Sequence, residues 1–439
     1  MIAFAKRATE KATEAICALS KVHHSQGEAT ILRMCGPTSR LKHLFRFPLE
    51  DATIDAFRSG DATTFSEVQR ILARPLTDSL TKFVSLSISA GGLGFKLLSQ
   101  TDNLQECVRA LASIERTFEE AEGHELPEDC VSVTRSYFDI IRALVLRRAA
   151  AGGSTLQCST GTGPATNWQS NLIAESIRST HASDFLYAAP GPGTTLTDNE
   201  YRDALWMRLG LAASTGHDDC IPNPQNDPLG LHRLGCRASA GARTNRHDEI
   251  FEVVAKAALS ADPNSFMVAR EEHLSDDVET QRRPGDVALN LGNGRTLIDL
   301  TVASPFSAAC ANASRLAGTP AAAAEAAHDR KTREWTALLD SNGLDAVQMV
   351  TQFVPLAGTA MGVWDCRSLR WLKLFLDACA ASTGEAAGSY FYSFMMKLSV
   401  ALWRANSRII RALRNSSEFA YCEEVNPVAP IPERTRDCY

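Results

Sequence analysis

The sequence has 439 residues, more than one hydrophobic core usually organises, so two or three domains are expected. Its composition, 44% hydrophobic and 22% charged, is that of an ordinary globular protein, and no apolar run is long enough to predict a transmembrane helix. The net charge of −6 argues against nucleic-acid binding through overall charge, so such a role would need local patches of Lys and Arg.

The N-terminal part of the chain is predicted to be helical. Its first residues, MIAFAKRATEK, are charged and lack the apolar core of a signal peptide, so an intracellular protein is expected, with its 12 cysteines as buried thiols or metal ligands. Apolar residues at helical spacing, as in NLQECVRALASIERTFEEA, extend the helical prediction over residues 1–150. Residues 151–200 are rich in Gly, Pro and small polar residues and are predicted to be a linker around one short helix.

Several further elements are predicted in the second half of the chain. Thr197 followed by Glu200 forms a capping-box pattern, which predicts a helix from there to about Leu209. Helices are also predicted at 247–259, at 320–340 and within the last eighty or so residues, before a disordered tail that starts at NPVAP. A strand is expected at 346–358, with Pro355 marking its end.

Residues 282–302, RRPGDVALNLGNGRTLIDLTV, are predicted to form a β-hairpin. Side chains alternate between the faces of a strand, so Asp286 lies on the face opposite Val287, and Asp299 on the face opposite Leu300. A two-residue Asn-Gly turn would pair Ala288 with Asp299 and Val287 with Leu300. The two aspartates would then be diagonal neighbours on one face, with backbones about 7–8 Å apart.

The aspartate pair has two interpretations. Asp286 and Asp299 could lie on the solvated polar face of an ordinary hairpin, which the hairpin residues alone favour. They could instead lean together onto one divalent ion, and oxygen ligands suit Mg²⁺, which takes one or two carboxylates plus water and phosphate oxygens.

A family resemblance shifts the balance towards the metal site. The stretch RPGDV…IDLTV resembles the core of the restriction-like endonuclease domain of non-LTR retrotransposon proteins, in the PD-(D/E)XK nuclease superfamily. In the same order, GLHRLGCRASAGARTNRHDEIFEVV resembles the family's histidine-cysteine knuckle and Arg-His helix start, and AAHDRKTREW its alanine-rich helix with a lysine. FVPLAGTAMGVW resembles the strand and turn that follow, and ILRMCGPTSRLKHLFRFPLE and SISAGGLGFKLLS resemble the thumb of the reverse transcriptase, so the resemblance covers most of 30–365.

The resemblance implies a fold class and a domain order. The fold class would be α/β, with a restriction-endonuclease-like domain of a mixed central sheet flanked by helices, preceded by an all-α region. The parts would be a helical thumb-like region, a linker, a helix with a zinc knuckle, the endonuclease domain, and C-terminal helices with a tail, at 1–150, 151–200, 201–240, 241–370 and 371–439. The chain lacks the aromatic-x-Asp-Asp turn of a polymerase core, so it resembles the C-terminal portion of such an element protein.

The implied activity is Mg²⁺-dependent nicking of DNA, the step that primes reverse transcription in such elements. Asp286 and Asp299 would be catalytic and hold the Mg²⁺. Thr301 stands at the usual lysine position and Gly285 between the Pro and Asp of the first motif, so Lys331 is expected to supply the lysine. The alternative is that Lys331 is an ordinary solvated helix lysine.

Other residues would support this site. The resemblance implies nucleic-acid-binding or supporting roles for Arg246, His247 and Arg283. An acidic residue of the 247–259 helix often completes such sites, and Glu249 and Glu252 are available without either being favoured.

The knuckle would be a second, structural metal site. Its ligands for Zn²⁺ would be His217, Cys220, His232 and Cys236, and a degenerate knuckle without metal is the alternative. The partners implied are a DNA target and element RNA, with no membrane, and the location implied is the nucleus. The rival function is a catalytically inactive nucleic-acid-binding fragment of such a protein.

Overall fold

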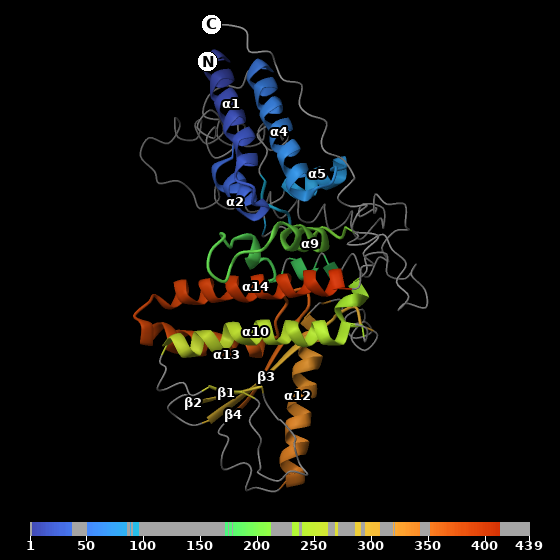
Figure 1. Cartoon of the computed structure of the whole chain (residues 1–439), viewed down its shortest axis with the longest axis vertical. Helices are drawn as coiled ribbons and strands as arrows, with labels where there is room; N and C mark the ends of the chain where they lie inside the picture. The colour runs from blue at the N-terminus through green and yellow to red at the C-terminus, as the bar shows by residue number, and fades with distance from the viewer. Residues whose placement is uncertain are drawn as a thin grey trace, which may run out of the picture.

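The computed structural model describes fifteen ranges of the chain, and every structural statement below refers to them: 2–36, 51–85, 88, 91–95, 172–173, 175–177, 179–211, 231–236, 239–261, 268–270, 286–290, 295–307, 319, 321–342 and 352–412. These residues form a stack of layers (Figure 1), which runs from the N-terminal helices through a central long helix to a small sheet.

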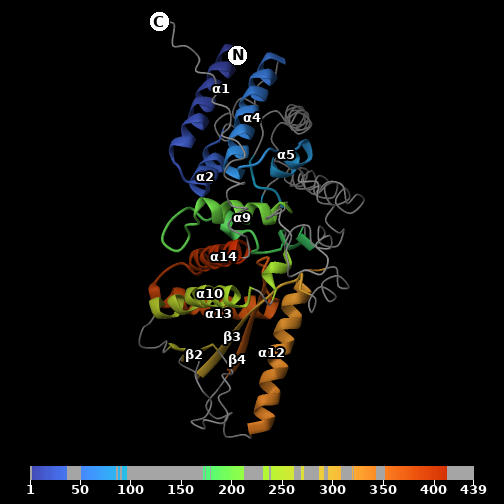
Figure 2. The same cartoon turned by 45° about the vertical axis from the view of Figure 1, so that its right-hand side comes forward.

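Helices form the first layer, as the apolar spacing predicts for the described part of residues 1–150. They are α1 (Ile2–Cys17), η1 (Ala18–Lys21), α2 (Ser25–Cys35), α4 (Asp51–Leu72) and α5 (Asp78–Ser85). In both views α1 and α4 lie side by side, with α2 and α5 at their lower ends (Figures 1 and 2).

A second layer is built around α9 (Asp198–Arg208). The predicted capping box is confirmed, because the Thr197 side chain accepts from the Glu200 N–H while the Glu200 carboxylate accepts from the Thr197 N–H. Part of the expected 151–200 linker is packed rather than exposed, since η4 (Asp184–Leu186) buries Phe185 against Tyr201 of α9.

The long helix α14 (Ala387–Ala412) lies between α9 on one side and α10 (Ala240–Ala261) with α13 (Cys366–Thr383) on the other (Figure 1). Trp403 is fully buried and packs with Phe185 in the N-terminal core. On another side of the same helix, Leu398 and Leu402 belong to the core that covers the sheet. One helix therefore contributes to both hydrophobic cores.

The sheet has four strands in the order β1-β2-β3-β4. They are β1 (Val268–Arg270), β2 (Val287–Asn290), β3 (Arg295–Ala303) and β4 (Gln352–Thr359). The first three are mutually antiparallel and β4 is parallel to β3, so the sheet is mixed.

The predicted hairpin register is wrong by two residues. Ala288 pairs with Leu297 and Val287 with Ile298, where the two-residue turn would have paired Ala288 with Asp299. A slip of two keeps every side chain on its own face, so the hydrophobic pattern could not distinguish the two registers. Asp286 precedes the paired residues of β2 and donates its N–H to Ile298 O. Its carboxylate contacts His247 of α10, whereas Asp299 contacts Lys331 of α12.

The prediction that Pro355 ends its strand is also wrong. Pro355 lies in the middle of β4 and pairs with Asp299 of β3. Because β4 is an edge strand, one side of it needs no ladder hydrogen bonds, and a residue without an N–H is tolerated there.

Helices cover both faces of the sheet. Ile298, Leu300 and Val354 pack with α10, α13 and α14 on one face. The other face carries Ala288 and Leu297, which pack with Trp335 of α12 (Ala321–Asn342), the helix predicted at 320–340. The α/β class, with a mixed sheet between helices, is therefore present, joined to a larger helical part.

No helix among the described residues combines the length and the apolar character that crossing a bilayer requires.

The shared role of α14 makes a prediction about stability. Trp403→Ala removes a fully buried indole and should lower the free energy of unfolding by about 3–5 kcal/mol. Tyr392→Ala on the same helix is the matched control, because that side chain is 56% exposed and its loss should change stability little. Urea unfolding followed by circular dichroism measures both, and equal effects would contradict the central position of α14.

Candidate functional site

Asp286 is fixed against the middle of β3. Its backbone N–H donates to the carbonyl oxygen of Ile298 over 2.8 Å, and its Oδ2 accepts from the N–H of Leu300 over 2.7 Å. The carboxylate therefore accepts a hydrogen bond from the Leu300 N–H of β3, the strand that carries Asp299. This bond stabilises an acidic residue just before β2.

Asp299 and Lys331 meet between β3 and α12. The Lys331 Nζ lies 2.9 Å from Asp299 Oδ2, and the two side chains are 25% and 11% exposed. Glu334 is a weaker partner of the same ammonium, at 3.8 Å. Lys331 is thus turned towards the sheet, and the fully solvated alternative does not describe it.

Two contacts hold α12 in the position that brings Lys331 to the sheet. The ring of Trp335 stacks on Phe353 of β4, with centroids 4.8 Å apart. Arg367 ties Asp329 of α12, at 2.7 Å, to Asp365, the residue that caps the first turn of α13. Sequence reasoning missed this clamp, although an aspartate two residues before an arginine at a helix start is a recognisable N-cap signal.

His247 of α10 completes the group. Its Nε2 lies 2.8 Å from Asp286 Oδ2, and its Nδ1 lies 3.2 Å from Asp248 Oδ1. Burial lowers the pKa of His247, but the hydrogen bonds and charges of Asp286 and Asp248 outweigh burial and raise the pKa above its usual value. The imidazole therefore favours its charged form beside the carboxylate.

Asp299 titrates far above an ordinary carboxyl. Burial is the main cause, and the nearby Asp286 carboxylate adds to it; Lys331 opposes both, and the net effect raises the pKa of Asp299 to about 6. The positive charge of Lys331 therefore does not fully offset the burial of Asp299 and the charge of Asp286.

The described residues offer a cation two carboxylates rather than a complete cage. None of the described ranges contains three or more His, Cys, Asp or Glu side chains grouped to hold a metal ion. Two carboxylates nevertheless suit Mg²⁺, which commonly takes water and phosphate oxygens for its other ligands. The raised pKa of Asp299 fits such an ion, because an added cation would offset the cost of burying the Asp299 charge and its repulsion by Asp286.

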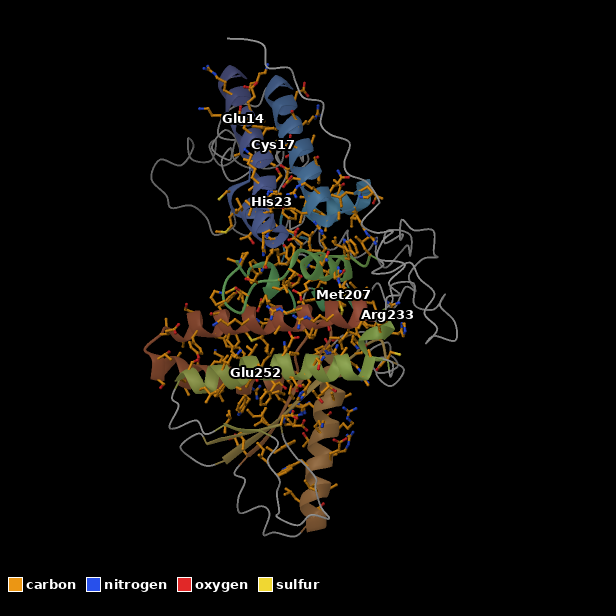
Figure 3. All side chains as sticks on the ribbon, in the orientation of Figure 1. Glu14, Cys17, His23, Met207, Arg233 and Glu252 are labelled. Carbon is orange, nitrogen blue, oxygen red and sulfur yellow. The ribbon has the colours of Figure 1, made fainter. Side chains whose placement is uncertain are left out.

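The acidic residues of α10 lie elsewhere. Glu249 is paired with Arg408 and lies 4.0 Å from Arg404, both on α14. Glu252 is paired with Lys256 along the outer surface of α10, at 3.8 Å (Figure 3). The acidic position that sequence reasoning left open is thus filled by neither residue, and His247 is what α10 contributes.

The expected helix start at Arg246 and His247 requires correction. The helix α10 begins at Ala240, so these residues lie well inside it. Arg246 is 2% exposed and donates to Asn406 Oδ1, to Leu234 O and to Val302 O, so it does not present its charge at the surface. Arg283 lies outside the described residues.

The knuckle is described only in part. His232 lies in η6 (Leu231–Leu234) and Cys236 follows it as a free thiol, both partly exposed. His217 and Cys220 fall outside the described ranges, so the four-ligand zinc site stays a prediction.

No protein-family model matches this chain, and no curated protein matches it either. The functional argument therefore rests on the geometry of the site.

The raised pKa of Asp299 predicts a stability effect with a definite sign. The folded-state pKa, about 6, exceeds the ordinary value of 3.8, so the folded state binds the proton more tightly between these values. Stability from this group is present below about pH 4 and lost as the pH rises through about 6. Relative to wild type, Asp299→Asn should therefore gain about 1 kcal/mol between pH 5 and pH 7 in urea unfolding.

Asp340→Asn is the control for this titration, because Asp340 is exposed on the same helix as Lys331. A pH profile of Asp299→Asn parallel to that of Asp340→Asn would show that the Asp299 carboxyl titrates normally.

Proposed function

We propose that this chain is a Mg²⁺-dependent DNA endonuclease that nicks one strand. The observation that carries the proposal is the meeting of Lys331 and Asp299 at 2.9 Å, beside an Asp286 carboxylate that His247 and a backbone N–H hold in place. Metal-dependent phosphodiester hydrolysis uses carboxylates that hold the metal and a cation that stabilises the charge developing on the phosphate.

In this proposal the residues divide the work. Water would attack the phosphorus as the bond to O3′ breaks. The attacking water gives its proton to solvent and O3′ takes one up from solvent, which leaves a 5′-phosphate and a 3′-hydroxyl. Mg²⁺, held by Asp286 and Asp299, would polarise the phosphate and offset its developing charge. Lys331 is held against Asp299, so in this scheme it would act as a fixed cation near the transition state and not as the base.

His247 is a positioning residue in this scheme. Its hydrogen bond leaves the second oxygen of Asp286 for a ligand while it fixes the orientation of the carboxylate. Below about pH 6 the Asp299 carboxyl carries a proton, so cleavage should require a pH above that value.

The proposal extends to the family. A mixed sheet with two aspartates on adjacent strands, and a lysine supplied by a flanking helix, supports a restriction-like domain of a retrotransposon-derived protein with a migrated lysine. DNA as target, element RNA as a further partner and a nuclear location belong to this proposal and depend on it.

A binding protein without cleavage is the second candidate. It is favoured because each aspartate already has a partner among the described residues, His247 for Asp286 and Lys331 for Asp299. Such a protein would keep the fold and the DNA contacts and need no metal.

Variants at the three central residues separate these candidates. Asp286→Asn, Asp299→Asn and Lys331→Met should each reduce nicking of supercoiled plasmid in Mg²⁺ by at least about a hundredfold. The aspartate variants weaken binding of the metal, and the lysine variant removes the cation beside the transition state. Arg330→Ala is the matched control, since Arg330 neighbours Lys331 but is exposed and pairs only weakly with Glu334, at 3.7 Å.

EDTA should abolish nicking by the wild type, and readdition of Mg²⁺ should restore it. Wild-type protein that binds DNA and never nicks it in Mg²⁺ or Mn²⁺ would establish the binding protein instead.

The zinc site is tested separately. We expect about one zinc ion per purified chain, lost in Cys236→Ser, because a structural site needs all of its ligands. The thiol of Cys366, which is exposed, provides the control variant Cys366→Ser. Zinc-free wild-type protein would point to a degenerate knuckle.

A further inference from the structure

Arg246 carries a buried charge that no carboxylate of the described residues balances. Its residue is 2% exposed, and its three hydrogen-bond acceptors within the described ranges are neutral: Asn406 Oδ1, Leu234 O and Val302 O. Its Nε is buried and has no hydrogen-bond partner. Buried guanidinium groups are usually compensated by an acid, because removal of the charge from water is costly.

A second arginine increases the positive charge at the same place. Arg243 lies one turn before Arg246 on α10, and its charge, after burial, is the other cause that lowers the pKa of Arg246, to about 10. The Nε of Arg243 is also buried without a partner, and no ion pair joins Arg243 to a carboxylate of the described residues. Two neighbouring guanidinium groups therefore share a region that lacks a negative charge.

The neighbouring backbone adds an unsatisfied hydroxyl. Arg246 reaches Val302, two residues before Ser304, whose Oγ is buried and unpartnered. On the other side it reaches Leu234, next to Gly235, and a Cβ at Gly235 would come within 2.8 Å of the Ser304 Cβ. This close approach places Ser304 beside η6 and the C-terminal end of β3; Arg233 of η6 lies near the same end of α10 (Figure 3).

This arginine-rich corner adjoins the carboxylate site. His247, which binds Asp286, directly follows Arg246 in α10, and Val302 lies three residues after Asp299 in β3. The same two elements, α10 and β3, therefore carry residues of both places.

We propose that Arg243, with the buried charge of Arg246 one turn further along α10, forms a subsite for a backbone phosphate of the DNA that the carboxylate site would bind. Arg243 would make the contact, because it is partly exposed and Arg246 is not. Arg246 would contribute through its field, since an uncompensated charge in a poorly solvated place attracts an anion more strongly than a solvated one. The subsite deepens the proposed nuclease function, and the DNA-binding alternative would use it equally.

Binding of DNA to catalytically silent protein tests the subsite. Duplex oligonucleotide is titrated in EDTA, where no cleavage occurs, and fluorescence anisotropy gives the affinity as a function of salt. Arg243→Ala should weaken binding roughly five- to tenfold at 0.1 M salt and lower the salt slope by about one ion, because one phosphate contact is lost. Arg243→Lys should keep most of the salt slope, since it keeps the charge.

The matched control is Arg370→Ala, which removes an equal charge from an exposed position on α13. It should change neither affinity nor salt slope beyond the small effect of net charge. Equal losses in Arg243→Ala and Arg370→Ala would overturn the subsite.

Thermal unfolding in inorganic phosphate gives an independent readout. Phosphate should raise the Tm of the wild type more than that of Arg243→Ala, because a ligand stabilises only the state that binds it. In phosphate-free buffer Arg243→Ala should be at least as stable as wild type, since it relieves repulsion with Arg246. A lower Tm without phosphate would show that Arg243 is a structural residue and would overturn the proposal.

These measurements fail separately from the proposed function. If plasmid is never nicked but Arg243→Ala still loses affinity and phosphate stabilisation, the nuclease is rejected and the subsite stands. If nicking depends on Asp299 and neither readout responds to Arg243, the subsite is rejected and the nuclease stands.

Discussion

The burial of α14 is the constraint on which the described structure depends. A helix that contacts one core on one side and a second core on another must be apolar over most of its circumference, and Trp403, Leu398 and Leu402 supply that surface. Its remaining positions near the C-terminal end carry arginines that pair with acids on the helices of both neighbours: Arg411 with Asp203 of α9, and Arg408 with Glu249 of α10. The helical layers and the sheet domain therefore fold around a common element, and neither has a complete core without it.

The same helix positions the candidate site. Asn406 of α14 is fully buried, accepts from Arg246 and donates to Ala360 O, 2.7 Å away, just after β4. This bridge fixes the rotation of α10 about its axis, and the rotation of α10 determines where the next residue, His247, can reach. The hydrogen bond between His247 and Asp286 thus depends on how the neighbouring Arg246 packs against α14.

Much of this arrangement follows from the sequence, but only where local chemistry decides it. The capping box at Thr197 and Glu200 is encoded within four residues, so the start of α9 could be predicted and is confirmed. The face of β3 that carries Asp299, opposite Leu300, follows from strand alternation, while the register of β2 against β3 does not, because a slip of two residues preserves every face.

Other features depend on distant parts of the chain. Pro355 predicts a strand end from the local sequence, because the position of β4 at the edge of the sheet depends on strands far away in the chain. Arg246 was expected to contact nucleic acid because its resemblance to a helix start concealed six preceding helical residues, and its burial is set by α14 and β3. Lys331 could be proposed only from a resemblance, since nothing near it in sequence indicates which face of α12 meets the sheet.

The charges of the site fall into two unequal groups. Around β2 and β3, two carboxylates face one ammonium and one histidine, so the net charge there is negative or zero, and it becomes more positive when a proton or a cation binds. At the C-terminal end of β3, Arg243 and Arg246 form a positive region, and the acceptors of Arg246 are neutral. A polyanion laid from the second group towards the first would be attracted at one end and repelled at the other until a cation or proton reached the carboxylates. In the proposed nuclease, such an arrangement would let DNA bind before the metal, and the productive complex would depend on both.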